Sequence, residues 1–170
     1  MRKKIFLVGL MGSGKSYWKN RLSKKYKIRS YDLDYIIETF EESSIDELFT
    51  EIGEAGFREK EAAALRMFRQ NNSFILATGG GTPCFHDNMD WMNEQGITIW
   101  LDESIDTLAD RLQTEKDHRP LIKNLSHEEI KNFIKVQYWE RLQFYEKATY
   151  RLKSKQINDA EFMKIIEENE

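Results

Sequence analysis

The sequence predicts an α/β fold in which a doubly wound, five-stranded parallel sheet is flanked by helices. Short apolar runs alternate with longer segments of helical periodicity along the chain, which is typical of βαβ units. A glycine-rich loop directly follows the first apolar run. The 170 residues contain only two prolines, no internal repeat and no low-complexity linker, so we expect one domain over residues 1–170.

Five short apolar runs are the expected strands, because a strand buried on both faces of a parallel sheet reads as a continuous hydrophobic run. They cover residues 5–8, 29–32, 74–78, 97–101 and, with the weakest pattern, 150–153. Helical spacing predicts helices over residues 15–25, 45–52, 57–69, 85–94, 105–112 and 128–147, and a docked C-terminal helix within 161–170. Ser44 and Glu47 have the spacing of a capping box.

Residues 113–124 form the longest connection without a clear period. They are polar and charged, and they separate two expected helices by more than a typical loop length. We expect a lid at this position. Composition alone leaves an ordinary surface loop as the alternative.

Composition also bounds the class of protein. The single cysteine, Cys84, cannot form an internal disulfide, and the N-terminus lacks the long apolar stretch of a secretion signal or membrane span, so we expect a cytoplasmic protein without a membrane partner. With a net charge of -3, the domain as a whole has no excess of positive charge that would favour binding to DNA or RNA. His86, His118 and His127 lack zinc-ligand spacing and are interpreted as structural or surface residues.

Residues 9–16 read Gly-Leu-Met-Gly-Ser-Gly-Lys-Ser, a full match to the phosphate-binding P-loop pattern. The glycines let main-chain N–H groups converge on phosphate oxygens, and the N-terminus of the following helix favours the same anion. Lys15 adds a positive charge, and the hydroxyl of Ser16 suits the magnesium that accompanies a nucleotide. The motif predicts a nucleoside triphosphate site, with a chance glycine-rich loop as the alternative.

Asp32 and Asp34 follow the second expected strand, at the edge of the sheet that would hold the phosphates. In a strand, residues at this spacing share a face. Two carboxylates there can divide magnesium ligation from the deprotonation of an attacking hydroxyl. The alternative is a solvated turn or a helix start with two acids near its N-terminus.

Two further features lie where an acceptor would bind. Arg58 and Glu61 are one helical turn apart, so an ion pair can fix the guanidinium for bidentate capture of a carboxylate, although spacing alone favours an exposed helical salt bridge. Gly79, Gly80 and Gly81 follow the third expected strand, where backbone N–H groups can touch a substrate. A flexible connector is the alternative for the glycines.

Three more arginines, Arg111, Arg119 and Arg141, could each be ordinary surface residues. Phosphoryl transfer spreads negative charge over the moving group, so arginines on a closing segment stabilise it. Arg119, beside Pro120 in the expected lid, is the best placed for this role.

As an ordered set, these residues resemble the shikimate kinases, small P-loop kinases with the three-layer P-loop NTPase fold. The resemblance extends from residue 9 to about residue 148. It rests on the P-loop, Asp32-x-Asp34, residues 49–58 as Phe-x3-Gly-Glu-x2-Phe-Arg with Glu61 following, the three glycines, Arg119-Pro120-Leu121 and Arg141-x3-Tyr145. The departure is Leu33, where the family usually carries a small hydroxyl residue. After residue 148, residues 154–158 are the candidate adenine-contacting loop.

The resemblance implies Mg²⁺-dependent transfer of the ATP γ-phosphoryl group to the 3-hydroxyl of shikimate, on the route to chorismate and the aromatic amino acids, by a monomer. Asp34 would be the catalytic base and would act with Lys15 and Arg119. Ser16 and Asp32 would bind magnesium. The implied nucleotide-binding residues are Gly12, Ser13, Gly14, Lys15, Ser16, Tyr17, Arg111 and Arg119. The implied shikimate-binding residues, many within a helical segment at about residues 33–61, are Asp34, Phe49, Phe57, Arg58, Gly79, Gly80, Gly81 and Arg141.

Two other kinds of protein share the P-loop. A gluconate kinase would also bind a hydroxy acid, but it should lack the Phe-Arg-x2-Glu unit and the Asp-x-Asp pair at these positions. A regulatory nucleotide switch would bind no small substrate, and the Asn-Lys-x-Asp tetrapeptide with which GTPases read guanine does not occur in this sequence.

Overall fold

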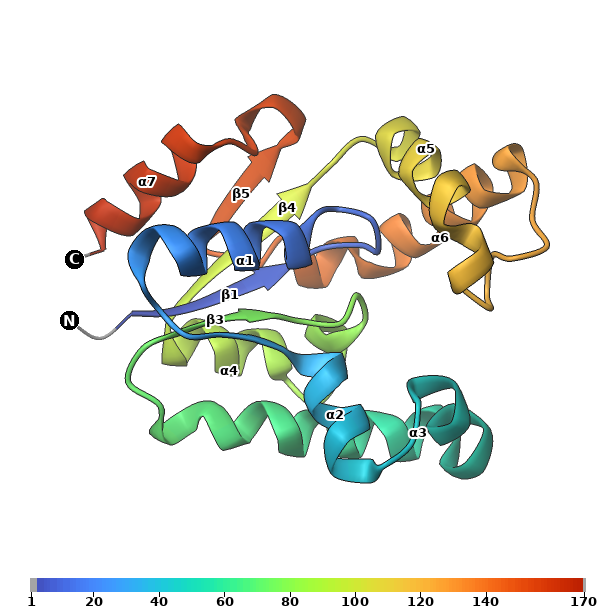
Figure 1. Ribbon diagram of the computed structural model, residues 1–170, viewed down its shortest axis with the longest axis horizontal. Coiled ribbons are helices and arrows are strands. Elements are labelled where there is room, and N and C mark those ends of the chain that lie inside the picture. Colours follow the sequence, from blue (N-terminus) through green and yellow to red (C-terminus); the bar gives the residue numbers. More distant parts are fainter. Residues whose placement is uncertain (1–2, 170) are drawn as a thin grey trace.

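The computed structural model describes residues 3–169, and over this range it contains one sheet of five parallel strands (Figure 1). The strands are β1 (Lys4–Val8), β2 (Ser30–Asp32), β3 (Phe74–Ala77), β4 (Ile97–Asp102) and β5 (Tyr150–Lys153). They lie in the order β2-β3-β1-β4-β5, and each neighbouring pair is parallel. The chain passes from β1 to the edge strand β2, returns to β3 beside β1, and then crosses to β4 and β5 on the other side, which confirms the predicted doubly wound sheet.

Seven α-helices in the described range cover the two faces of the sheet. They are α1 (Lys15–Tyr26), α2 (Leu33–Glu41), α3 (Ile45–Arg66), α4 (Asn88–Gln95), α5 (Ile105–Glu115), α6 (His127–Tyr145) and α7 (Asp159–Glu168). The predicted capping box at Ser44 and Glu47 is present at the start of α3. None of the helices in residues 3–169 has the length and apolar character needed to cross a bilayer.

Strand β1 explains why the sequence reads as a continuous apolar run. Ile5 and Leu7 belong to one hydrophobic core, which is shared with α1 and α7, whereas Phe6 and Val8 belong to a second core shared with α2 to α6. All four side chains are fully buried. Because successive side chains of a strand point to opposite faces, both faces of β1 are covered by helices.

The carboxylates of Asp32 and Asp34 do not share the face of a strand, and this part of the prediction is wrong. Strand β2 ends at Asp32, whose side chain caps α2 by accepting from the backbone N–H of Tyr35 at 3.4 Å, and Asp34 lies in the first helical turn. Leu33 between them is fully buried in the core with Ile37. The acid at the N-cap and the buried Leu33 therefore begin a helix where the pair was expected to continue a strand.

The expected end of a helix at residue 52 is confirmed, because Gly53, with φ 71° and ψ 176°, breaks α3 there. Two other expected helix boundaries differ. The second part of α3 ends at Arg66 and residues 67–70 form a 3-10 helix, whereas the helix was expected to run to residue 69. Helix α4 begins at Asn88 and not at residue 85, because His86 and Asp87 have left-handed φ angles of 50° and 51°. The start of α4 does not follow from apolar spacing, since it depends on single backbone angles.

The segment at residues 113–124 is more regular than its composition indicates. Its first three residues complete α5, and a 3-10 helix (Lys116–His118) follows. Successive turns then join the backbone N–H of Ile122 to the carbonyl of Arg119 at 3.1 Å, and Ile122 is fully buried. The segment is therefore anchored near its C-terminal end, between α5 and α6.

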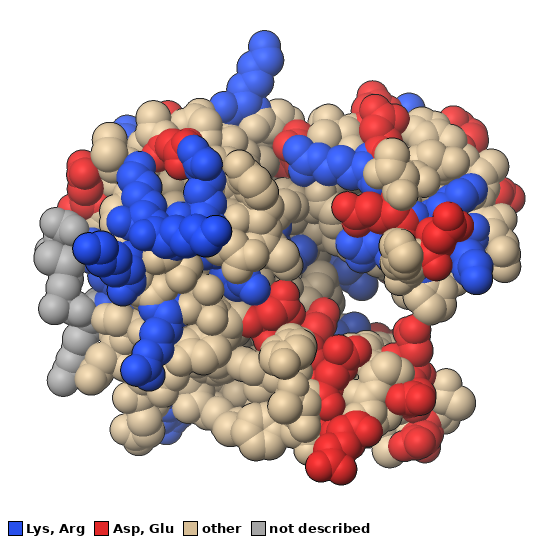
Figure 2. Space-filling model, viewed as in Figure 1, with Lys and Arg blue, Asp and Glu red and all other residues tan. Residues whose placement is uncertain are grey.

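Charge is unevenly distributed over the surface. Figure 2 shows Lys and Arg gathered over α1, and Asp and Glu over α2 and α3, with a hollow between these two helices and the lobe of α5 and α6. Helix α1 contributes Lys15, Lys19, Arg21, Lys24 and Lys25 and no acid. The net charge of -3 therefore conceals two patches of opposite sign.

Replacing Leu33 by the small hydroxyl residue usual in the family is expected to destabilise this chain. Leu33→Ser leaves a cavity and a buried hydroxyl in the core, which should lower the free energy of unfolding by about 3 kcal/mol. Urea denaturation measures the change, with Leu121→Ser as control because Leu121 is 67% exposed. Equal stability of the two variants would contradict the role of Leu33 in the core.

Candidate functional site

The loop after β1 has the geometry that its glycines predict. Gly14 immediately precedes α1 and has a φ of 96°, in the left-handed region that side chains rarely adopt. Gly9 has a φ of 146°, and a Cβ added there would lie 2.8 Å from the carbonyl oxygen of Leu101 in β4. The loop curls against β4 and leads into the N-terminus of α1, which is the strand, loop and helix context of a P-loop.

The ammonium group of Lys15 lies inside this loop. Its Nζ donates to the carbonyl oxygens of Gly9 at 2.7 Å and of Leu10 at 2.9 Å. Burial lowers the pKa of Lys15 from 10.5 to about 8, while the carboxylate of Asp34 acts in the opposite direction. Lys15 is thus still mostly a cation at neutral pH, held at the mouth of the loop.

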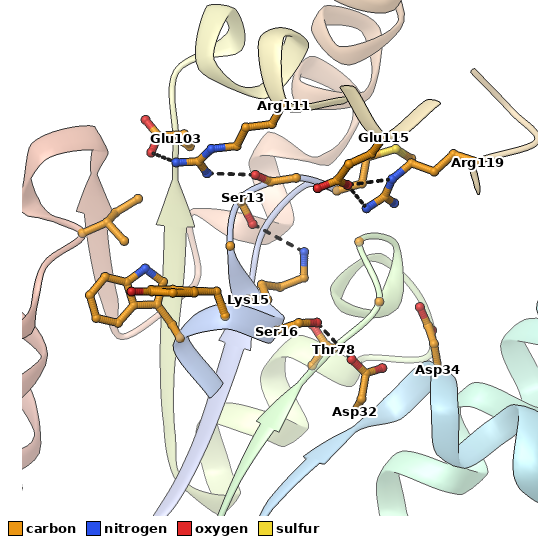
Figure 3. A pocket seen from close by; sticks show the side chains of 18 residues that line it. Ser13, Lys15, Ser16, Asp32, Asp34, Thr78, Glu103, Arg111, Glu115 and Arg119 are labelled. Atoms are coloured by element: carbon orange, nitrogen blue, oxygen red, sulfur yellow. Dashed lines mark hydrogen bonds and ion pairs between the residues drawn. The ribbon is translucent and has the colours of Figure 1, made fainter. Parts of the chain in front are cut away.

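A cavity of about 630 Å³ opens beside the loop (Figure 3). All the predicted nucleotide-binding residues line it, namely Gly12, Ser13, Gly14, Lys15, Ser16, Tyr17, Arg111 and Arg119. Asp32, Asp34, Gly79 and Gly80 line it too, together with Trp18, Glu103, Glu115 and Ile157. The cavity therefore joins the P-loop to the residues that follow β2 and β3.

Ser16 and Asp32 bring a hydroxyl and a carboxylate together at one side of the cavity (Figure 3). The hydroxyl of Ser16 donates to Oδ2 of Asp32 at 3.2 Å, and Nζ of Lys19 lies 4.0 Å from the same oxygen. A hydroxyl and a carboxylate in a solvated position fit Mg²⁺, which prefers oxygen ligands and retains several waters.

Two arginines from α5 and the segment after it border the cavity, and each is held by an acid (Figure 3). Arg111 donates to the carbonyl of Gly12 at 2.9 Å and lies 3.4 Å from Glu103. Arg119 pairs with Glu115 at 2.9 Å. Arg111 is therefore tied to the P-loop, whereas Arg119 is tied only to its own end of the lid segment.

Asp34 lies where the cavity meets the glycine run. Burial raises its pKa from 3.8 to about 6, and the neighbouring carboxylates of Asp32 and Glu61 raise it further, against the effect of Lys15. Asp34 is therefore more basic than an ordinary aspartate and is still mostly ionised at neutral pH. This combination suits a group that accepts a proton from a hydroxyl.

The three glycines after β3 lie in close contact with the ends of three side chains. A Cβ added to any of them would lie within 3 Å of a functional side chain: 2.9 Å from Oδ1 of Asp34 at Gly79, 2.8 Å from Nη1 of Arg141 at Gly80, and 2.9 Å from Cζ of Arg58 at Gly81. None of the three has a positive φ. The run is thus a packed surface against three predicted acceptor residues, and not a flexible connector.

The Arg58–Glu61 pair is buried, so the exposed salt bridge that spacing favoured is wrong. Nη1 of Arg58 donates to Oε1 of Glu61 at 2.9 Å, and Oε2 of Glu61 accepts from the hydroxyl of Thr82 at 2.8 Å. Arg58 is 7% exposed, and its buried Nε has no hydrogen-bond partner in the structure. Buried donors are rarely left without a partner, and an acceptor on a bound ligand would satisfy this one.

Aromatic rings surround the same guanidinium. Cζ of Arg58 lies 5.8 Å from the ring centre of Phe49, 5.2 Å from that of Phe57 and 4.3 Å from that of Phe85. Phe49 and Phe57 also contact each other, at 4.6 Å between ring centres. The two predicted phenylalanines therefore lie beside Arg58, although neither lines the cavity.

Arg141 reaches the glycine run from α6, next to Tyr145. The side chain of Tyr145 is fully buried, and its hydroxyl donates to the carbonyl of Gly80 at 2.6 Å. Burial raises the pKa of Tyr145, and the charge of Arg141 acts in the opposite direction. Tyr145 thus joins α6 to the loop after β3, beside Arg141.

Sequence reasoning assigned no role to several residues of this site. Tyr145 appeared only as part of a motif, and Phe85, Thr82, Glu103 and Glu115 carried no signal. Thr82 and Phe85 lie within six residues of Gly79, so their place near the glycine run was readable, but their contacts with α3 were not.

Comparison with known proteins decides which kind of P-loop protein this is. The family model described as shikimate kinase matches residues 11–169. The chain belongs to the shikimate kinase family. It is 39% identical over 156 residues to the shikimate kinase of Phocaeicola vulgatus, covering 92% of this chain and 89% of the relative. It is 39% identical over 168 residues to that of Flavobacterium psychrophilum, covering 98% and 96%.

Solved shikimate kinases have the same fold. The crystal structure from Bacteroides thetaiotaomicron matches with a TM-score of 0.92 at 34% identity, covering 99% of both chains. The shikimate kinase from Acinetobacter baumannii, in complex with shikimate, matches with a TM-score of 0.86 at 26% identity, covering 100% of this chain and 96% of the other. This chain is accordingly an ATP-dependent kinase of the shikimate kinase family, and the gluconate kinase and nucleotide switch alternatives fall away.

The ionised carboxylate of Asp34 is expected to cost stability. The pKa of Asp34 is raised from 3.8 in the unfolded chain to about 6 in the folded protein, so the protonated carboxyl favours the folded state. This stabilisation is fully present below pH 3.8 and is lost as the pH rises through 6. Asp34→Asn should therefore unfold with a free energy about 2 kcal/mol higher than the parent at pH 8, with little difference at pH 3.5.

Urea denaturation at both pH values measures this effect. Asp90→Asn is the matched control, because Asp90 is half-exposed and pairs with Lys147 at the surface. A parent protein as stable as Asp34→Asn at pH 8 would show that the Asp34 carboxylate is not destabilised by its surroundings.

Proposed function

We propose that this kinase transfers the γ-phosphoryl group of ATP to the 3-hydroxyl of shikimate with Mg²⁺, giving shikimate 3-phosphate and ADP. The observation that carries the proposal is the buried Nε of Arg58, a donor without a partner. The glycine run connects it to the base, because Gly79 packs against Asp34, which lines the cavity with the P-loop, and Gly81 packs against Arg58. Shikimate has a ring hydroxyl and a carboxylate to match the last two.

Arg58 is suited to bind the carboxylate of shikimate. Glu61 accepts from Nη1 and so leaves the edge formed by Nε and Nη2, where Nη2 has only a 3.3 Å contact with the half-exposed Glu54. Two parallel donors on one planar edge match two carboxylate oxygens. Arg141, beside Gly80, supplies a second positive charge for the same group, and Phe49 and Phe57 provide apolar surface beside Arg58.

Asp34 is the group that removes the proton from the attacking hydroxyl. With a pKa near 6 it is ionised at neutral pH and binds a proton more strongly than an ordinary aspartate does. As the proton moves to Asp34, the hydroxyl oxygen attacks the γ-phosphorus and ADP leaves. Lys15 and Arg119, both on the wall of the cavity, offset the negative charge on the transferred group.

Ser16 and Asp32 are the residues that would hold Mg²⁺, because their oxygens lie 3.2 Å apart beside the P-loop. The ion, when bound, neutralises charge on the β and γ phosphates. Ser16 would bind it directly, and Asp32 would orient its waters while also capping α2.

We also propose that the protein is a monomeric cytoplasmic enzyme that acts on a small molecule and not on nucleic acid. Every side chain assigned above comes from one chain, so no second copy is needed to complete the site. Cys84 is a free thiol, which suits a reducing compartment. Light scattering of the purified protein tests the monomer, and a dimer mass at assay concentration would contradict it.

The activity is tested with purified protein, ATP, Mg²⁺ and shikimate in a coupled assay of ADP release, with gluconate and nucleoside monophosphates as control acceptors. We expect ADP release when shikimate is the acceptor and none with the control acceptors. Asp34→Asn should show no turnover but should still bind nucleotide. Because Asp34 must be ionised, kcat/KM should fall about tenfold per pH unit below pH 6. Absence of shikimate-dependent ADP release would refute the proposal.

Arg58→Ala is expected to act mainly on shikimate binding. Loss of the charged hydrogen bonds to the carboxylate should raise KM for shikimate about tenfold or more. KM for ATP should stay within about twofold, since Arg58 does not line the cavity beside the P-loop. Arg69→Ala is the control, because Arg69 is an exposed arginine that does not line the cavity. Unchanged kinetics for shikimate in Arg58→Ala would remove the assigned role.

The segment at residues 113–124 is proposed to close over the bound substrates. Closure requires Arg119 to leave Glu115, an exposed ion pair that contributes little to stability. Hydrogen exchange should therefore slow over residues 113–124 when an unreactive ATP analogue and shikimate are added together. Exchange that is the same with and without the two ligands would count against a lid.

A further inference from the structure

The guanidinium of Arg58 is held by groups from two separate segments. Phe49, Phe57 and Glu61 all belong to α3, the helix that carries Arg58 itself. Phe85 comes from the segment between the 3-10 helix (Thr82–Cys84) and α4, and its ring is the nearest of the three, at 4.3 Å from Cζ. Of these three rings, that of Phe85 is the one contributed by the segment after β3. Its contact therefore connects the guanidinium to that segment.

The backbone around Phe85 is fixed on both sides. The side-chain amide of Asn88, fully buried, donates to the carbonyl of Thr82 at 2.9 Å. Arg66 donates to the carbonyl of His86 at 2.8 Å and also hydrogen-bonds the Asn88 side chain. With left-handed angles at the next two residues, the chain turns sharply after Phe85. The ring is therefore presented from a constrained turn.

The hydrogen bonds of Arg58 hold its guanidinium unequally. Glu61, which is buried, accepts from Nη1 at 2.9 Å, whereas Nη2 contacts the exposed Glu54 at 3.3 Å, an ion pair that fixes the plane of the guanidinium only weakly. A flat cation prefers to lie over the face of an aromatic ring when both are shielded from water, and Arg58 is buried. The ring of Phe85 can define this plane, and with it the direction of the unpartnered Nε.

We propose that Phe85 is a positioning residue that orients the guanidinium of Arg58, so that its Nε edge is presented to the carboxylate of the acceptor. The inference rests on the role of Arg58 given under the proposed function. Phe85 lies outside the motifs on which the family resemblance depends. It would act on acceptor binding through Arg58, without contact with the nucleotide.

The test replaces the ring while keeping apolar volume. Phe85→Leu should raise KM for shikimate about fivefold, with kcat and KM for ATP within about twofold of the parent. Phe85→Tyr, which keeps the aromatic face, should restore the parental value. Phe133→Leu is the matched control, a half-buried phenylalanine of α6 that has no role in the site. Phe85→Met is measured alongside in case the leucine variant folds poorly, and thermal unfolding is recorded for each.

The same changes in an Arg58→Lys background separate the two proposals. Lysine has no planar edge to orient, so adding Phe85→Leu to Arg58→Lys should change KM for shikimate less than twofold. If Arg58→Lys raises this KM but Phe85→Leu does not, the positioning role is overturned while that of Arg58 stands. If Arg58→Lys leaves it unchanged, the proposed function of Arg58 fails and the positioning role with it. Equal losses in kcat and in both KM values for Phe85→Leu, with no rescue by tyrosine, would indicate a purely structural residue and overturn the proposal.

Discussion

The common direction of the five strands is the constraint on which the site depends. Because all neighbouring pairs are parallel, the segments that follow the strands emerge at one edge of the sheet. Ala77 of β3 is paired with Leu7 of β1 on one side and with Asp32 of β2 on the other. The P-loop, the two aspartates and the three glycines therefore meet, although they are separated by up to seventy residues along the chain.

Close packing at this edge creates the electrostatic properties of the site. Burial lowers the pKa of Lys15 and raises that of Asp34, and each charge partly opposes the shift of the other. The buried pair of Arg58 and Glu61 is satisfied at Nη1 but leaves Nε without a partner. Buried charges and an unpaired donor lower the stability of the folded protein at these positions. The same groups are suited to proton transfer and carboxylate binding.

Contacts between distant segments then fix the individual side chains. Tyr145 joins α6 to the carbonyl of Gly80, and Thr82 joins the loop after β3 to Glu61 on α3. The glycine run lets these elements approach one another, because a Cβ there would lie within 3 Å of Asp34, Arg141 or Arg58. The proposed acceptor half of the site is thus held from three directions by groups that are remote in sequence.

The sequence by itself determined the sheet and the P-loop and indicated which side chains are candidates for the reaction, because apolar periodicity and fixed motif spacing are local properties of the chain. It did not determine that Asp32 ends a strand and caps a helix, nor that Arg58 is buried, since spacing gives the face of an element but not what covers that face. The tertiary structure alone decided the places of Phe85 and Tyr145, and the burial of Leu33. These depend on contacts between segments far apart in sequence, and no local pattern encodes such contacts.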